Sequence, residues 1–355
     1  MKKQQLDFLK ALCHAHTPSG AELPGQRIVA QYVKPYVDQI RLDPLGNLHA
    51  VVNPDAPYRV MIDAHCDEIG LLVQYIDENG FIFFSCVGGV NKQLLPGERV
   101  VLNGPKGPVN AVIGRKPIHL MSAREREAGV GELTELWLDI GASSRKEAEA
   151  LAPLGTFGVV DSGWRELLGD RVSARAFDDR CGVFVIMEAL RRLKGRKPKV
   201  ACHFVSATQE ELGLLGSGVA AYGIDPHAGI SVDVTFACDH PNADKRIGAD
   251  IRVGGGPVLG VGPNYDPAFC DRVRAAAAKL KTPLQIQPRA RGNGTDAFTM
   301  RHTRAGVPVV QLSIALRYMH SAVEVISLDD LDREADLIAE TLASLPAKPE
   351  LGFKL

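Results

Sequence analysis

The sequence predicts an α/β protein, with a sheet wrapped by helices and interrupted by an inserted β-rich segment. From Asp170 onward, apolar strands alternate with loops and helices, which is the order of elements typical of an α/β sheet. The pattern of predicted elements differs in residues 70–164, where short β-rich segments are joined by turns of Gly, Asn and Pro. A single core stops growing at about 250–300 residues, so a chain of 355 residues has room for two domains. We therefore expect a discontinuous domain of residues 1–69 plus 165–355 and an inserted domain of residues 70–164.

The amino-terminal region predicts two helices and then three strands. The leucines of "MKKQQLDFLKALCHAH" fall at helical spacing, while Asp7 and Lys10 interrupt what a signal peptide needs as an apolar core. We interpret this segment as an amphipathic helix that ends at "TPSG" and is followed by a helix through "GQRIVAQYVKPYV". Two short strands should flank the turn at residues 45–47, and the apolar run "RVMI" should form a buried strand.

The remaining elements follow the same logic. Within the insertion, which resembles a small β-barrel, "SRKEAEAL" predicts one helical piece. The later segments "KVACHFVSA", "AGISVDVTFA" and "VPVVQLSIAL" predict strands, and a final helix is expected from about Leu328 to Leu345.

Charge and cysteine content narrow the possible partners. Lysine plus arginine (41) nearly balances aspartate plus glutamate (42), so the chain has no basic field for nucleic acid or anionic lipid. No run approaches the ~18 apolar residues of a membrane span, so we expect a soluble protein. The seven cysteines form no CxxC pair and no disulfide-scaffold spacing, which favours the reducing cytoplasm.

Metal-capable side chains follow or lie within five separate segments of the predicted sheet and helices. They are His65, Asp178 with Asp179, Glu210 with Glu211, Asp233 and His320. In open α/β sheets, ligands bind beyond the carboxyl ends of the strands, so we expect these side chains to converge. Two imidazoles with several carboxylates suit zinc, cobalt or manganese.

The first of these segments, "DAHCDEIG", pairs a histidine with an acid. Residues two apart on a strand share a face, so His65 and Asp67 point the same way and Cys66 does not. A metal-bound histidine usually donates its second ring N–H to a carboxylate, and Asp67 is the candidate for that support. The alternative is that His65 is a core histidine satisfied by a nearby acid.

The two acidic pairs each leave a choice open. One glutamate of Glu210–Glu211 could bind a metal while the other acts as general base, although an adjacent acidic pair can also be a solvated turn before a helix. One aspartate of Asp178–Asp179 could bridge two metals while the other caps a helix beginning near Arg180. Spacing alone does not decide either choice.

The chain lacks HExxH, GxSxG and GxxxxGK[ST], which excludes thermolysin-like proteases, serine hydrolases and P-loop enzymes. Instead it resembles metallopeptidase family 42, the tetrahedral aminopeptidases. The resemblance rests on "AHCDEIG", "AFDDRCG", "TQEELGLLGS", "SVDVT", "GTDA" and "RYMHSAVEV", in family order. It implies a phosphorylase/hydrolase-like catalytic domain with a mixed sheet, a PDZ-like β insertion that mediates dimerisation, and a dodecamer. Asn293, before "GTDA", departs from the more glycine-rich form of that motif.

Position by position, the resemblance also implies roles for the site residues. One metal would be held by His65, Asp178 and Asp233, and the other by Asp178, Glu211 and His320. Glu210 would be the general base, and Asp67 would support the first histidine. The expected protein is thus a cytoplasmic aminopeptidase with two divalent ions, zinc or cobalt before manganese, that acts on short peptides with a free amino terminus. A metal-bridging water would attack while Glu210 takes and returns the proton.

Two other hydrolase classes compete with this reading. A deacylase of N-blocked amino acids could use the same dinuclear chemistry. A glycoside hydrolase could use paired carboxylates, but it has no need for two histidines among them.

Overall fold

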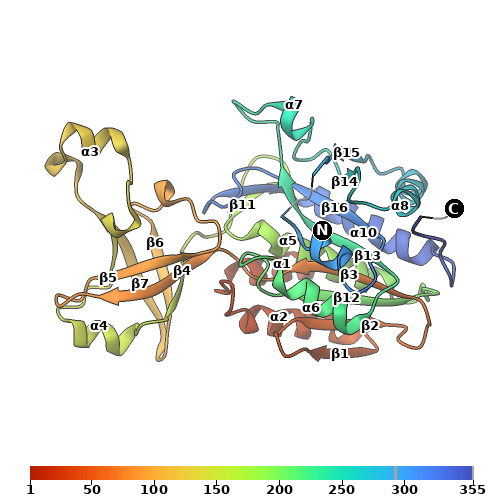
Figure 1. The fold of residues 1–355 in the computed structure, drawn as a ribbon, viewed down its shortest axis with the longest axis horizontal. Coiled ribbons are helices and arrows are strands. Elements are labelled where there is room, and N and C mark those ends of the chain that lie inside the picture. The colour runs from red at the N-terminus through yellow and green to blue at the C-terminus, as the bar shows by residue number, and fades with distance from the viewer. Residues whose placement is uncertain (292–293, 354–355) are drawn as a thin grey trace.

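The computed structural model describes residues 1–291 and 294–353, so Gly292 and Asn293 of the glycine-containing loop lie outside it. The chain forms two lobes, one built on a mixed sheet flanked by helices and the other a closed β-barrel (Figure 1). The expected α/β architecture with a barrel-like insertion is confirmed.

The main sheet places the carboxyl ends of its central strands along one edge. Across the described residues it has eight strands in the order β1 (Gln39–Leu42), β2 (Leu48–Val52), β12 (Ala201–Ala207), β3 (Arg59–His65), β13 (Ala228–Phe236), β16 (Val309–Leu316), β14 (Val258–Val261) and β15 (Gln285–Pro288). Strands β12, β3, β13 and β16 run parallel, whereas β2 pairs antiparallel with β12 and β14 antiparallel with β16. The expected turn between two short strands is the antiparallel β1–β2 connection.

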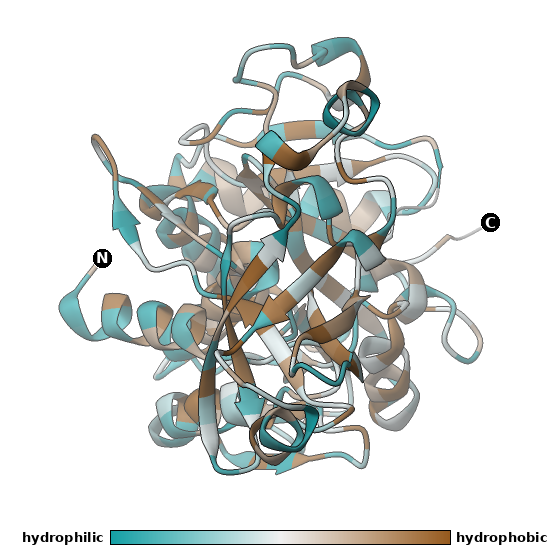
Figure 2. Cartoon of the chain, turned by 90° about the vertical axis from the view of Figure 1, so that its left-hand side faces the viewer, coloured by the Kyte–Doolittle hydropathy of each residue, from teal (hydrophilic) through white to brown (hydrophobic). Residues whose placement is uncertain are grey.

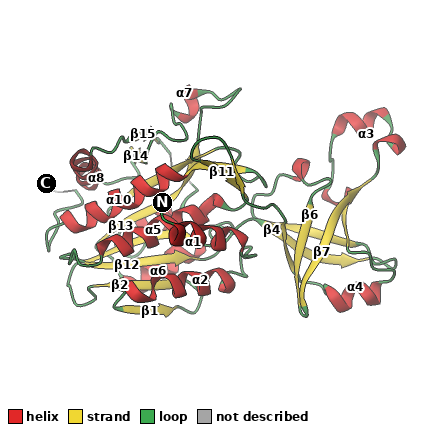
Figure 3. Ribbon diagram, turned by 180° about the vertical axis from the view of Figure 1, so that it is seen from behind, coloured by secondary structure: helices red, strands yellow, loops and turns green. Residues whose placement is uncertain are grey.

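Helices cover both faces of this sheet (Figure 3). One face packs against α1 (Lys3–His14), α2 (Leu23–Val33), α5 (Phe177–Leu193), α8 (Pro267–Leu280) and α10 (Leu328–Ser344), and the other against α6 (Leu215–Ile224) and α9 (Asp296–Arg301). Strand alternation divides the two cores, because Val60 and Ile62 of β3 enter the first and Met61 the second. Helix α7 (Lys245–Gly248) lies in a loop that projects from this lobe (Figure 1).

The barrel consists of antiparallel strands that close on themselves. In ring order they are β4 (Gly70–Ile76), β5 (Ile82–Val87), β8 (Leu136–Asp139), β7 (Gly107–Arg115), β6 (Arg99–Gly104) and β9 (Phe157–Val160). Its own apolar core includes Leu71, Ile82 and Leu136. Figure 2, seen from the barrel side, shows the apolar segments along these strands. Helices α3 (Ala123–Ala128) and α4 (Arg145–Leu151) attach to this lobe (Figure 1).

A small antiparallel sheet lies where the chain leaves the barrel. It contains β10 (Arg165–Glu166), β11 (Arg171–Ala174) and β17 (Glu324–Ser327), so it joins the segment before α5 to the segment after β16. Short 3₁₀ turns complete the described elements: η1 (Lys34–Tyr36), η2 (Lys92–Leu94), η3 (Ile118–Leu120) and η4 (Leu133–Glu135). No helix in the described part of the chain has both the length and the apolar character to cross a membrane.

Candidate metal centre

The sheet brings the predicted residues to one edge. His65 ends β3, and in the parallel ladder it lies opposite Ala207, the last residue of β12, so the Glu210–Glu211 segment emerges beside it. Asp233 lies on β13, the other neighbour of β3. Asp178 opens α5 directly after β11, and His320 follows β16.

Two groups of possible metal ligands form there, and they share one aspartate. His65, Asp178 and Asp233 make the first group, and Asp178, Glu211 and His320 make the second, with the ligand atoms of each group within 4.8 Å of one another. Asp178 Oδ1 lies 3.2 Å from His65 Nε2, while its Oδ2 lies 3.3 Å from His320 Nε2. The two oxygens of one carboxylate therefore face two different histidines.

The charge balance of the site favours bound cations. In the part of the chain that the structure describes, no lysine or arginine lies within ion-pair distance of Glu210, Glu211 or Asp233. Burial, with Asp178 close by, raises the pKa of Asp233 to about 7. Burial and neighbouring carboxylates likewise raise the pKa of Glu210 to about 9. Carboxylates crowded in this way need protons or metal ions, and the donor set of two imidazoles and three carboxylates fits zinc, cobalt or manganese.

The same carboxylates raise the pKa values of both histidines. Hydrogen bonds to Asp178 and Glu211 raise the pKa of His320 to about 11. Burial lowers the pKa of His65, but the surrounding carboxylates, Glu210 first, outweigh it and raise that pKa well above its usual value. Metal binding at these imidazoles must therefore displace protons.

Glu210 and Glu211 face different histidines. Glu210 Oε2 lies 3.9 Å from His65 Nε2, whereas Glu211 Oε1 lies 3.2 Å from His320 Nε2. Their backbone N–H groups donate to the two oxygens of Asp67, each over 3.1 Å. Asp67 Oδ1 also lies 3.4 Å from His65 Nδ1, and the Ser19 hydroxyl donates to its other oxygen. The fully buried Asp67 thus connects a candidate ligand with the glutamate turn.

The two aspartates of the second pair also separate. Asp179 Oδ1 accepts a hydrogen bond from Gly182 N over 3.1 Å, and regular helical angles begin only after Asp179, so this residue caps the helix. Its Oδ2 accepts from His65 N over 3.3 Å. Asp178 faces the histidines. Of the two alternatives left open by spacing, the cap therefore belongs to Asp179.

Two contributors to the site were missed by the sequence reasoning. Glu324, four residues after His320 in "HSAVEV", accepts hydrogen bonds from His320 N over 3.0 Å and from Asp178 N over 3.2 Å. The carbonyl oxygen of Gly89, from the barrel lobe, lies 3.0 Å from His320 Nδ1. A Cβ at Gly89 would lie only 2.8 Å from that nitrogen, so the close approach requires glycine. The "GG" of "CVGGV" was the available signal for this contact.

An open cavity of about 690 Å³ lies over both groups of candidate ligands. Beyond those residues, its lining includes Thr235, Arg289 and Met319. The Arg289 guanidinium donates to Thr235 Oγ1 and to Gln287 Oε1, both over 2.8 Å, so these contacts hold its position at the wall. One side of the cavity wall is therefore cationic.

Comparisons with known proteins agree with this geometry. The family model described as M42 glutamyl aminopeptidase matches residues 46–337. The chain is 36% identical over 341 residues to the lysyl aminopeptidase of Pyrococcus furiosus, covering 96% of this chain and 97% of that protein.

Solved structures extend the likeness to the whole fold. The TET aminopeptidase of a marine sediment archaeon of the Thaumarchaeota superposes with a TM-score of 0.91 at 32% identity, covering 96% of each chain. The TET1 peptidase of Pyrococcus horikoshii, described as assembling into a tetrahedron or a large octahedral shell, gives a TM-score of 0.85 at 30% identity, covering 96% of this chain and 100% of that one. This chain therefore belongs to the M42 glutamyl aminopeptidase family of metallopeptidases and is a peptide hydrolase.

Proposed function

We propose that this aminopeptidase is a dinuclear metalloenzyme that removes the amino-terminal residue of short peptides. One ion would be held by His65, Asp178 and Asp233, and the other by Asp178, Glu211 and His320, so Asp178 would contribute to both. The observation that carries the proposal is the Asp178 carboxylate, whose two oxygens face the two histidines at 3.2 and 3.3 Å. A single shared carboxylate between two donor groups is the arrangement that places two ions close together.

The chain's own groups can handle the proton transfers. Divalent ions held by these residues would supply a nucleophilic water of lowered pKa and would polarise the scissile carbonyl. Glu210 lies beside His65 without being part of either donor group, and it lines the open cavity. It takes the proton from the attacking water and returns it to the leaving amine. Asp67 accepts a hydrogen bond from the Glu210 main chain and faces His65 Nδ1. These contacts fix the position of the proposed base relative to the metal ligand His65.

The acidic lining of the cavity supports an exopeptidase. A free α-amine is cationic or a metal ligand, and it would meet Asp233, Glu210 and the adjacent donor group. A peptide bond in the middle of a chain presents no such charge. The proposed substrates are therefore short peptides with a free amino terminus.

Relatives and cysteine chemistry support a proposal for the assembly and location of the protein. The TET1 relative is described as assembling into a tetrahedron or a large octahedral shell, and a second solved structure is described as a dodecamer. We infer that this chain also forms a homo-oligomer, dimers joined into a dodecamer, with the inserted lobe of residues 70–164 mediating dimerisation. The remaining residues, 1–69 and 165–355, form the catalytic domain. The cysteines are free thiols, which supports a cytoplasmic location.

A direct comparison of two substrates tests the exopeptidase. An aminoacyl chromogenic amide should be hydrolysed, while the same compound with an N-acetyl group should resist hydrolysis. Equal rates of chromophore release would remove the exopeptidase claim, whereas release of acetate from the N-acetylated compound would favour the deacylase alternative. Activity that survives full chelation would instead favour a glycosidase-type pair of carboxylates, assayed on a β-glucan.

A further inference from the structure

We propose that Glu324 is a positioning residue that sets the affinity of the second metal, the one assigned to Asp178, Glu211 and His320. The inference rests on the proposed dinuclear centre. Glu324 belongs to neither donor group. It acts through the main chain of two ligands that lie far apart in the sequence.

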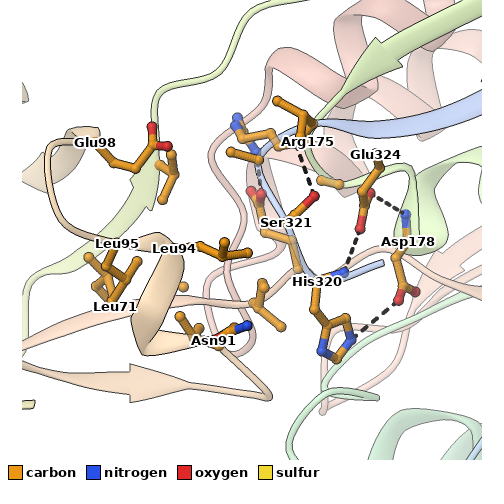
Figure 4. A pocket seen from close by; sticks show the side chains of 18 of the residues that line it. Leu71, Asn91, Leu94, Leu95, Glu98, Arg175, Asp178, His320, Ser321 and Glu324 are labelled. Carbon is orange, nitrogen blue, oxygen red and sulfur yellow. Dashed lines mark hydrogen bonds and ion pairs between the residues drawn. The ribbon is translucent and has the colours of Figure 1, made fainter. Parts of the chain in front are cut away.

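The contacts are specific and buried. Glu324 Oε1 accepts the hydrogen bond from His320 N over 3.0 Å, and Oε2 accepts the one from Asp178 N over 3.2 Å. Figure 4 shows the carboxylate between these two backbone nitrogens, on the wall of a cavity between the two lobes, while the His320 ring turns toward the Asp178 carboxylate. The side chain is 2% exposed, so water does not compete for these hydrogen bonds.

Both ligand segments have unusual backbone conformations that need stabilising contacts from neighbouring groups. His320 has φ 59° and Tyr318 has φ 64°, the left-handed region that side-chain-bearing residues rarely adopt. Ala176, two residues before Asp178, has φ 57°. Conformations of this kind persist only where surrounding contacts over-determine them. The Glu324 carboxylate is one contact that acts on both segments at once.

Glu324 itself is held by regular structure. It begins β17, and its register partner in β11 is Ala174, four residues before Asp178. On its other side, Arg317 and Val325 exchange backbone hydrogen bonds of 3.0 and 3.1 Å, which close the loop that carries His320. The small sheet is therefore the frame from which Glu324 reaches both ligands.

The two proposed metals should respond differently to the loss of this carboxylate. Glu324 holds two of the three ligands of the second metal, but only the shared Asp178 of the first. The first metal has another support, because Asp179 accepts the hydrogen bond from His65 N. Changes behind the ligands typically cost about 10–100-fold in metal affinity, so we expect a loss of that size at the second metal and a smaller one at the first.

The test compares Glu324→Gln, Glu324→Asp and a matched control, Glu334→Gln. Glutamine keeps one acceptor and turns an NH₂ group toward the other backbone N–H, whereas aspartate keeps two acceptors on a shorter stem. Glu334 is also fully buried, but its carboxylate has no hydrogen-bond partner among the described residues. Each purified full-length protein is equilibrated with cobalt at graded free concentrations set by a chelator. Bound metal is then counted per chain and followed by visible absorption.

We expect two ions on the wild type and on Glu334→Gln. Glu324→Gln should bind one ion with a smaller loss of affinity and the second about 10–100-fold more weakly, with hydrolysis recovering in excess cobalt. Glu324→Asp should lie between. Equal affinities of both ions in Glu324→Gln and wild type would overturn the inference. Should Glu324→Gln fail to fold, as judged by circular dichroism, the same criterion applies to Glu324→Asp. A wild type that binds fewer than two ions would instead refute the dinuclear centre itself.

Discussion

Replacing Asp67 with asparagine tests how the site is held together, because one fully buried carboxylate makes four contacts there. Its oxygens accept the backbone N–H groups of Glu210 and Glu211 at 3.1 Å each, accept the Ser19 hydroxyl, and lie 3.4 Å from His65 Nδ1. Asparagine has nearly the same shape but offers one acceptor oxygen. At least one backbone N–H of the glutamate turn would therefore face another donor.

The expected losses in metal affinity and turnover follow from the hydrogen bonds that asparagine cannot make. A hydrogen bond to a charged acceptor contributes about 1.5–3 kcal/mol, and an outer hydrogen bond to a metal ligand typically changes metal affinity by about 10–100-fold. Displacing the proposed base by about 1 Å can lower turnover by about 100-fold. We therefore expect Asp67→Asn to bind metal about 10–100-fold more weakly and to keep a kcat lower by about 100-fold even with both ions bound.

The assay measures bound metal by chelator competition and kcat on an aminoacyl amide at saturating metal. Asp266→Asn is the matched control, because Asp266 is also buried and accepts two backbone N–H groups, from Phe269 at 2.8 Å and Gly352 at 3.0 Å, away from the metal centre. Both variants should lose stability, but only Asp67→Asn should lose metal affinity and kcat. Wild-type metal affinity and turnover in Asp67→Asn, or equal losses in the control, would refute the reasoning.

Three further predictions concern the base, the protons and the pocket. Glu210→Gln should keep both ions yet lose about 10²–10⁴-fold in kcat; substantial retained activity at full metal loading would place the base elsewhere. In the metal-free protein, the pKa values of Asp233 (about 7), Glu210 (about 9) and His320 (about 11) are raised, so the folded chain holds protons that the unfolded chain releases. The free energy of unfolding in chelator should therefore fall as the pH rises from about 6 to about 9, and added cobalt should stabilise the protein more at the higher pH; a melting temperature in chelator that is independent of pH would contradict this. Arg289 lines the cavity, so Arg289→Ala should lower kcat/KM for a glutamyl amide about 10-fold or more, with little change for a leucyl amide; parallel losses would remove Arg289 from specificity.

Local patterns predicted the elements and the residues at their ends. The apolar run before His65 predicted β3, and the acids after β11 and β12 predicted where charged groups would gather. The order β12–β3–β13–β16 rests on pairing between distant segments, which no local pattern encodes. The choice of Asp179 as the cap required backbone angles. Glu324 and Gly89 reach His320 through a hairpin and a barrel loop, so their contacts exist only once the lobes are assembled.

Titrating the metal-free protein with cobalt while following hydrolysis of an aminoacyl amide tests the dinuclear centre most directly. The shared Asp178 predicts that activity rises until two ions are bound per chain and then levels off. Full activity in the presence of chelator, or a plateau at one ion per chain, would contradict the account.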